Sequence, residues 1–474
     1  MLRFFTRIII FFTFFLPVIA QAQGYKITLN TKNTIDSVLY LAHVYEQQIS
    51  IDDTTKIADN RFVFIDDEEI PEGMYAIVNG KNEVIFDFFI TSNKETEINV
   101  DMQHPTESLR AVNSMENNLY FDFRREVQAA KNKLDDAEKM YKQNPDNMMY
   151  LNKYLDGITE YNSHALKKYN KIFAKNKHLL AAKFIKLSID PLYRVYNNSN
   201  KIPDSTSVNP IYKSQYLDNF PFDDIRIINT KLFTQKTDFY LDTLCIQSIE
   251  SLKPEIDKLL LLSAREPDLQ AYMAWYLLNK FEQPKFWGLD ALYVYIYDYY
   301  IKSKKIKLLF PSMQPLIENK IKVMKPLLIG QPARQLMLKD MQGNTHDLLN
   351  VDAKYTVLLF WSTRCSHCRH EMPEFDKLYK ELHTPYNMEI FSVSTDTSYN
   401  QWTSYLKRNP KPWINVFGRK PVQGNYFKLY NVITTPTIYI FDDKKQIIGK
   451  QIPPDKIKTL IIEREKNKNM AKRK

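Results

Sequence analysis

The sequence has few cysteines and few glycines, and each scarcity excludes a class of protein. The 474 residues include only 3 Cys, too few for a fold held together by disulfide bonds, and only 10 Gly, too few for a collagen-like or glycine-rich chain. After the first 22 residues, no run approaches the roughly 18 apolar residues of a membrane-spanning helix. Hydrophobic residues nevertheless make up 44% of the chain, which is enough for several globular domains.

The charge is basic, with a formal net value of +10, but it is not concentrated in a binding stripe. The last twelve residues carry six Lys or Arg against two Glu, and the rest of the excess is spread along the chain. Because no basic segment is interleaved with aromatic residues, we expect a solvated, frayed basic tail over 467–474 and no nucleic-acid partner.

The first 22 residues have the pattern of a secretory signal peptide. Arg3 and Arg7 form a charged start, residues 8–19 are mainly apolar, and Ala20-Gln21-Ala22 is a cleavage site of the A-x-A type. A membrane anchor is the alternative, but the apolar run is shorter than the roughly 20 residues that span a bilayer. We therefore expect export, cleavage and a soluble periplasmic protein.

Residues 23–105 alternate apolar and polar side chains over short stretches, the pattern of half-buried strands. Clusters of Asn, Asp, Pro and Gly separate these stretches. The pattern predicts a β-sandwich-like N-terminal domain with strands at 25–29, 38–42, 61–65, 74–77, 84–90 and 97–100.

Residues 106–325 change to a helical period and predict an all-α middle domain. Its clearest stripe runs from Leu119 to Tyr141 at spacings of three and four. Further helices are expected at 166–187, at 254–262 with Pro254 in the first position, at 268–281 and at 289–301. Cys245 has no other cysteine nearby in sequence and is interpreted as a small buried hydrophobe.

Residues 326–466 carry the most specific pattern in the chain. The apolar strand Tyr355–Trp361 leads into Cys365-Ser-His-Cys368, and helical periodicity follows from Glu374. This order places Cys365 at a helix N-terminus, where unpaired backbone N–H groups favour a thiolate and lower a thiol pKa from about 8.5 to about 3.5–7.5. Cys368, one turn further on, is spaced to form a disulfide with Cys365.

With these residues in place, the C-terminal third resembles the thioredoxin fold of exported TlpA/ResA-type thiol-disulfide oxidoreductases. The resemblance depends on the Phe360-Trp361 strand end, the C-x-x-C motif, Pro373 eight residues after Cys365, and Thr435-Pro436 before an apolar strand. The whole chain also resembles multidomain proteins of Bacteroidetes-type bacteria, with a DUF4369-like β-rich region, a DUF5106-like helical region and a thioredoxin-like end. Two features depart from the family: Leu359 replaces a buried Asp, and Arg364 replaces the usual Trp.

The resemblance implies an α/β C-terminal domain in which Cys365 and Cys368 form a catalytic redox disulfide. Pro436 in cis and Thr435, near Trp361, would hold the substrate. Arg364 and His367 are expected to favour the Cys365 thiolate. Protein thiols and disulfides are then the partners, a membrane electron donor is possible, and no cofactor or metal is required. The direction of electron flow is ambiguous, with reduction favoured over oxidation or isomerisation, and the oligomeric state is undefined.

Other interpretations of this sequence remain open. A peroxidase site would need Pro where Leu358 stands, attachment of c-type haem would need His where Arg369 stands, and zinc ligation by Cys365, His367, Cys368 and His370 would crowd one helix start. A different class of function is partner binding or scaffolding. In that case residues 23–325 would recognise a protein, and the thioredoxin-like domain would be an effector or structural module.

Overall fold

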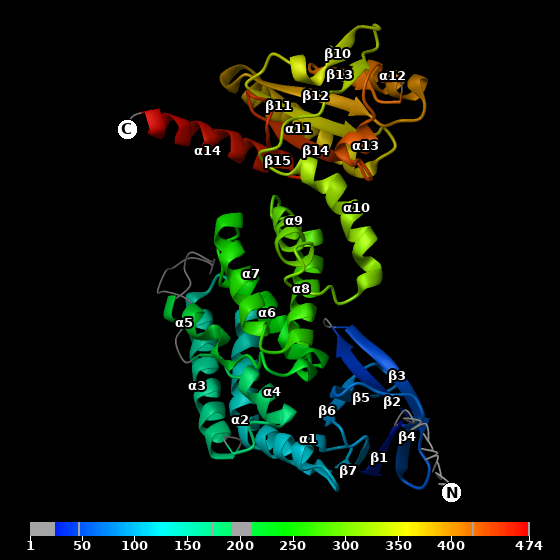
Figure 1. Ribbon diagram of the computed structural model, residues 1–474, viewed down its shortest axis with the longest axis vertical. Helices are drawn as coiled ribbons and strands as arrows, with labels where there is room; N and C mark the ends of the chain where they lie inside the picture. The colour runs from blue at the N-terminus through cyan, green and yellow to red at the C-terminus, as the bar shows by residue number, and fades with distance from the viewer. Residues whose placement is uncertain (1–23, 46–47, 173–174, 192–209, 420, 473–474) are drawn as a thin grey trace, which may run out of the picture. The chain divides into compact units, whose positions relative to one another are not determined.

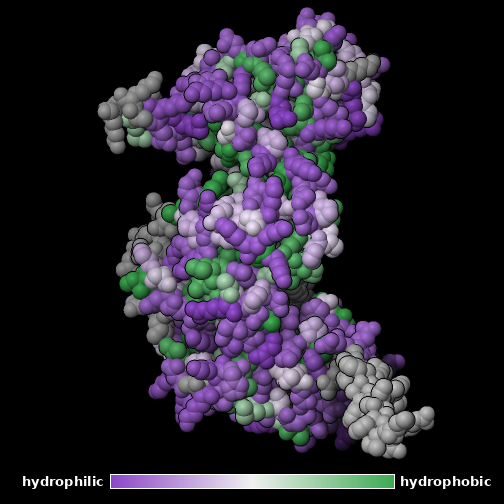
Figure 2. All heavy atoms as spheres, in the orientation of Figure 1, coloured by the Kyte–Doolittle hydropathy of each residue, from purple (hydrophilic) through white to green (hydrophobic). Residues whose placement is uncertain are grey.

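The computed structural model describes residues 24–45, 48–172, 175–191, 210–419 and 421–472 (Figure 1). The predicted signal peptide lies outside the described residues. The chain divides into two compact units, residues 1–244 and 245–474, which are described separately. No described helix is both long and apolar enough to cross a membrane. The face in view in Figure 2 is mainly hydrophilic with scattered hydrophobic patches, as expected when most large apolar side chains are buried in cores.

The first unit begins with two four-stranded sheets, ordered β4-β1-β7-β8 and β3-β2-β5-β6. In β1, alternate side chains are buried, which matches the period-two pattern of the sequence. The strand β3 was not predicted, because it lies at a sheet edge and its polar sequence QISIDDTTK is largely exposed. The strands are β1 Tyr25–Lys32, β2 Val38–Tyr45, β3 Gln48–Lys56, β4 Arg61–Asp66, β5 Gly73–Val78, β6 Val84–Ile90, β7 Glu95–Asp101 and β8 Arg110–Ala111.

Helices complete the first unit. The helix α2 (Met115–Gln143) contains the predicted stripe and is capped by Ser114, whose side chain accepts a hydrogen bond from the Asn117 amide. The prediction of a single helix over 166–187 was wrong, because α3 ends at Ile172 and α4 begins at Leu180. The other helical segments are α1 Pro105–Ser108, α3 Met148–Ile172, α4 Leu180–Ser188, α5 Pro210–Gln215, η1 Tyr216–Asn219, η2 Ile225–Asn229 and α6 Lys231–Thr243.

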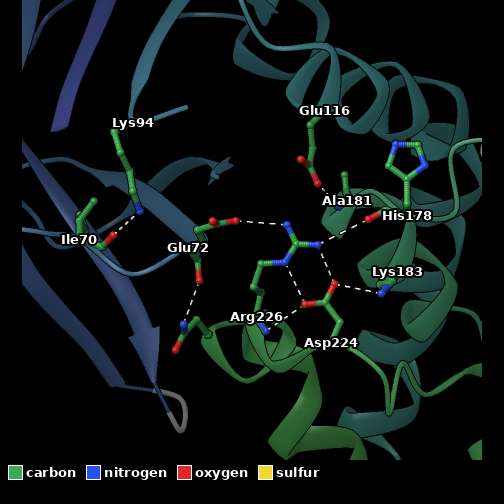
Figure 3. A network of polar contacts seen from close by, with 10 residues as sticks. Ile70, Glu72, Lys94, Glu116, His178, Ala181, Lys183, Asp224 and Arg226 are labelled. Atoms are coloured by element: carbon green, nitrogen blue, oxygen red, sulfur yellow. Dashed lines mark hydrogen bonds and ion pairs between the residues drawn. The ribbon is translucent and has the colours of Figure 1, made fainter. Parts of the chain in front are cut away.

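A polar network within this unit joins the sheets to the helices (Figure 3). The Arg226 guanidinium in η2 donates to Asp224 at 2.7 Å and to Glu72, which precedes β5, at 3.2 Å. Lys183 of α4 forms a second ion pair with Asp224 at 3.0 Å. Burial alone would raise the pKa of Asp224, but the hydrogen bonds and charges of Arg226 and Lys183 outweigh it, so the pKa is lowered.

The second unit begins with the helices α7 Ile249–Ser263, α8 Pro267–Glu282, α9 Ala291–Ile296 and α10 Gln314–Met324, with a π-helical turn, η3, at Tyr297–Ile301. The prediction that Pro254 is the first residue of its helix was wrong: Pro254 lies inside α7, because Ser248 caps the helix and α7 begins at Ile249, five residues before the expected start. Cys245 is completely buried, which agrees with its interpretation as a small hydrophobe.

A seven-stranded sheet follows, in the order β10-β9-β13-β12-β11-β14-β15. The central strand β11 is parallel to β12 and antiparallel to β14. Its alternate side chains enter two separate cores, with Val357, Leu359 and Trp361 in one and Leu358 and Phe360 in the other. The strands are β9 Met337–Lys339, β10 Thr345–Asp347, β11 Tyr355–Trp361, β12 Met388–Ser394, β13 Ile414–Phe417, β14 Thr437–Phe441 and β15 Ile447–Lys450.

The helices of this domain are α11 Ser366–Tyr386, α12 Tyr399–Arg408, α13 Tyr426–Tyr430 and α14 Pro454–Lys472. The first core of the sheet includes residues of α11, α12 and α14, and the second includes residues of α13. The prediction of a frayed tail was wrong for residues 467–472, because α14 continues through them.

Replacing Arg226 with Gln is expected to lower the free energy of unfolding of the first unit by about 2 kcal/mol, since the carboxylate of Asp224 would lose a close partner. The side chain of Asp224 is only 7% exposed. Because its folded pKa is lowered, this loss should be complete at neutral pH and should shrink as acid protonates the carboxylate. Urea unfolding, with hydrogen exchange followed over residues 24–244, measures the effect.

The matched control is Lys133→Gln, which removes an ion pair to Glu160 whose side chains are 69% and 60% exposed. That change should cost less than about 0.5 kcal/mol. Equal effects of the two substitutions would contradict a structural role for the Arg226 network.

Candidate functional site

The strand β11 and the helix α11 position Cys365 between them. The strand ends at Trp361, and Cys365 is the N-cap residue of α11, with extended backbone angles. Its Sγ accepts a hydrogen bond from the Cys368 amide at 3.1 Å, and its own amide donates to the Ser362 carbonyl at 3.1 Å. The sulfur therefore takes the place that a Ser or Asp oxygen normally has at a helix start.

Hydrogen bonds at this helix start favour the ionised form of Cys365. Partial burial alone would raise the pKa of the thiol, but hydrogen bonds involving Cys368, Thr435 and the His367 amide outweigh it, so the pKa is lowered. A lower thiol pKa increases the thiolate fraction near neutral pH, and the thiolate is the nucleophilic form. Cys365 is partly exposed, so an external sulfur can reach it.

Cys368 has the opposite character. Its side chain is only 2% exposed and belongs to the apolar core that also contains Leu359, Trp361 and Met372. Burial, together with a hydrogen bond from its thiol to Cys365, raises the pKa of Cys368 to about 12. Leu359 stands where the resemblance places a buried Asp, and its apolar side chain contributes to this low-dielectric surrounding. The pair therefore consists of one accessible, acidic thiol and one buried, neutral thiol.

The loop before β14 lies against the cysteines. The Thr435–Pro436 peptide bond is cis, as the resemblance implies. The thiol of Cys365 donates to the Thr435 carbonyl at 3.2 Å. The pairing of Phe360 with Thr437 brings the start of β14 to the end of β11, which places this loop beside the Cys365 turn.

Asp396 is a residue of this site that the sequence analysis missed. Its carboxylate is 3% exposed and lies just beyond β12. It accepts hydrogen bonds from the Ser362 hydroxyl at 2.6 Å and from the Thr363 hydroxyl at 2.9 Å and amide at 3.1 Å, and thereby holds the turn before Cys365. The sequence signal that could have identified Asp396 is its position just after β12. Because β12 is parallel to β11, the carboxyl ends of both strands lie at the same edge of the sheet, where Cys365 also lies.

The other predicted site residues lie near the cysteines but differ in exposure. Arg364 is exposed, and its Nε donates to Gln401 of α12 at 3.1 Å. His367 is exposed on the first turn of α11. Trp361 is only 1% exposed and packs against Tyr405, so it has no free surface for the substrate contact expected from the sequence. Among the described residues, no group of three His, Cys, Asp or Glu side chains is placed to hold a metal.

Two parts of the chain match known protein families. Residues 329–450 match the AhpC/TSA family, and residues 201–309 match a domain of unknown function, DUF5106. The second match confirms the predicted DUF5106-like character of the middle region, and the first, together with the relatives described next, confirms the predicted thioredoxin-like resemblance of the C-terminal region. The DUF4369-like character of the N-terminal region stays a prediction.

Individual relatives cover the same C-terminal region. Thioredoxin-like protein YneN of Bacillus subtilis is 30% identical over 118 residues, which are 24% of this chain and 66% of that protein. Thiol-disulfide oxidoreductase ResA of Geobacillus kaustophilus is 29% identical over 123 residues, which are 25% of this chain and 68% of that protein. A solved domain of a possible thiol-disulfide isomerase from Cytophaga hutchinsonii is 27% identical, with a TM-score of 0.29, and the match covers 31% of this chain and 98% of that domain.

The two cysteines are expected to differ sharply in alkylation. The rate at which iodoacetamide alkylates Cys365 should rise with pH. It should reach half its maximum at a pH below about 8.5, the pKa of a free thiol, because the folded pKa of Cys365 is lowered. Cys368 should stay unmodified until the pH approaches its raised pKa of about 12 or the protein unfolds. Mass spectrometry of the reduced protein across a pH series measures both.

The variant Cys368→Ser is the control, because it keeps the backbone N–H that donates to Cys365 Sγ while removing the second thiol. In this variant, the pH at which Cys365 is alkylated at half its maximum rate should remain below that of a free thiol. A midpoint at or above the free-thiol value in both proteins would contradict stabilisation of the thiolate by the helix start.

Proposed function

We propose that this chain, whose C-terminal domain is thioredoxin-like and related to thiol-disulfide oxidoreductases, exchanges disulfides with substrate proteins through Cys365 and Cys368. The observation that carries the proposal is the asymmetry of the pair. Cys365 is accessible and its pKa is lowered, whereas Cys368 is buried one helical turn away and its pKa is raised. Such a pair suits a nucleophile and a resolving thiol.

In the reducing direction, the Cys365 thiolate attacks one sulfur of a substrate disulfide. A mixed disulfide forms, and the other substrate sulfur leaves as a thiolate. Cys368 then loses its proton to solvent and attacks Cys365 Sγ, which forms the internal disulfide and releases the second substrate thiolate. Two electrons pass from the protein to the substrate, and an external dithiol must restore the reduced pair.

The loop of Thr435 and cis-Pro436 is proposed to hold an extended substrate segment beside Cys365, by pairing with its backbone. Arg364 adds positive charge close in sequence to Cys365, and Arg364 and His367 are proposed to favour the thiolate further. Reduction is favoured over oxidation or isomerisation. We also propose export through residues 1–22 to the periplasm, supply of electrons by a membrane donor, and the three-part order of β-sandwich, helical and thioredoxin-like domains.

Trapping of the mixed disulfide tests the roles of the two cysteines. In Cys368→Ser, the second attack cannot occur, so the variant should accumulate covalent adducts with an oxidised substrate protein such as insulin, and dithiothreitol should release them. Non-reducing electrophoresis and mass spectrometry detect these adducts at Cys365.

Cys365→Ser is the matched control and should form no adduct, because Cys368 is buried. Wild-type protein should reduce insulin in the presence of dithiothreitol faster than either variant. Adducts on Cys368 rather than Cys365, or wild-type turnover without any adduct in Cys368→Ser, would show that the assigned roles are wrong.

A further inference from the structure

The surface around Cys365 carries basic and apolar side chains, with almost no acidic ones. The turn and first helical positions 362–370 contain Arg364, Arg369 and two His but no Asp or Glu. The segment 421–436, which ends at the cis-Pro loop, contains no Asp or Glu either. The first carboxylates along α11 are Glu371 and Glu374, beyond its first turn.

Asp396, the carboxylate that holds the turn before Cys365, is buried. Asp396 is 3% exposed, and its oxygens accept hydrogen bonds from Ser362, Thr363 and Ser394. Its oxygens are therefore not available for contact with a substrate segment. Gly418 lies at the same edge of the sheet, because its amide donates to the Ser394 carbonyl at 2.9 Å and the next residue of that strand end, Thr395, donates to the Trp361 carbonyl at 2.8 Å. The exposed Arg419 directly follows Gly418.

Exposed apolar groups lie beside Arg419 and on the loop that leads to Thr435. The Arg419 guanidinium lies over the ring of Phe427, 5.4 Å from its centroid, and Phe427 is 43% exposed. Ile433, two residues before Thr435, is 82% exposed. Ile433 therefore offers uncovered aliphatic surface on the loop whose Thr435 carbonyl contacts the Cys365 thiol.

We infer that this surface selects substrate segments that carry acidic side chains beside the cysteine and an apolar side chain to cover Ile433. The inference rests on the proposed function, since it names the substrate class of the same site. Opposite charges at the rim of a contact mainly raise the association rate and reject partners of like charge, and salt weakens both effects. The specificity of the exchange would then come from Arg419 and Ile433, residues that do not take part in the chemistry.

The test uses the reduced full-length protein and two synthetic peptides, each closed by one disulfide and equal in length. Glu flanks the cysteines in one peptide, and Lys replaces it in the other. At low ionic strength the acidic peptide should oxidise the protein about tenfold faster than the basic one, and this ratio should fall as salt is added. Arg419→Glu should lower the ratio at least about threefold, and Arg419→Gln should have an intermediate effect.

Lys444→Glu is the matched control, because Lys444 is exposed in the turn between β14 and β15, at the opposite end of β14 from the cis-Pro loop. It should leave the ratio unchanged. A ratio near one at low salt, or equal changes in the Arg419 and Lys444 variants, would overturn the inference.

Uncharged 2-hydroxyethyl disulfide separates this outcome from failure of the proposed function. If the reduced protein reacts with this compound but is oxidised by both peptides at the same rate, only the inferred charge selectivity is wrong. If the reduced protein reacts with neither the compound nor the peptides, the proposed exchange activity is wrong and the selectivity falls with it.

Discussion

The hydrogen bond from the Cys368 amide to Cys365 Sγ is the contact on which the proposed chemistry depends. It exists because Cys365 is the N-cap residue of α11, and Cys365 has this position because the turn after β11 is held by Asp396 and by the Ser362 carbonyl. The same helix carries Cys368 into the apolar core beneath the turn. A single helix start thus makes one sulfur accessible and acidic and the other buried and neutral, which is the difference that ordered disulfide exchange requires.

The central part of this site was predictable from sequence because it is local. An apolar strand, a C-x-x-C motif and a helical period follow one another within about 30 residues, and each has a well-defined physical pattern. Pro436 was also found, but only through the resemblance to a family. Asp396 was missed because its partners Ser362 and Thr363 are 34 and 33 residues away, and no periodicity connects them.

The errors in the fold have similar causes. Alternation of apolar residues could not identify β3, which is a polar edge strand, and helical periodicity did not detect the break between α3 and α4. Pro254 was taken as a helix start because its missing N–H is tolerated there, but Ser248 caps the helix earlier. Trp361 was assigned to the substrate surface although alternation along β11 places it in a core with Val357 and Leu359.

The most direct test of the account is the reduction potential of the Cys365/Cys368 pair in the full chain. Protein equilibrated with glutathione or dithiothreitol buffers is alkylated and analysed by mass spectrometry. We expect one two-electron transition between about −270 and −120 mV, with a Cys365–Cys368 disulfide as the oxidised product and Cys245 unmodified. Absence of that disulfide over the whole range, or oxidation that joins Cys245 to either cysteine, would contradict the account.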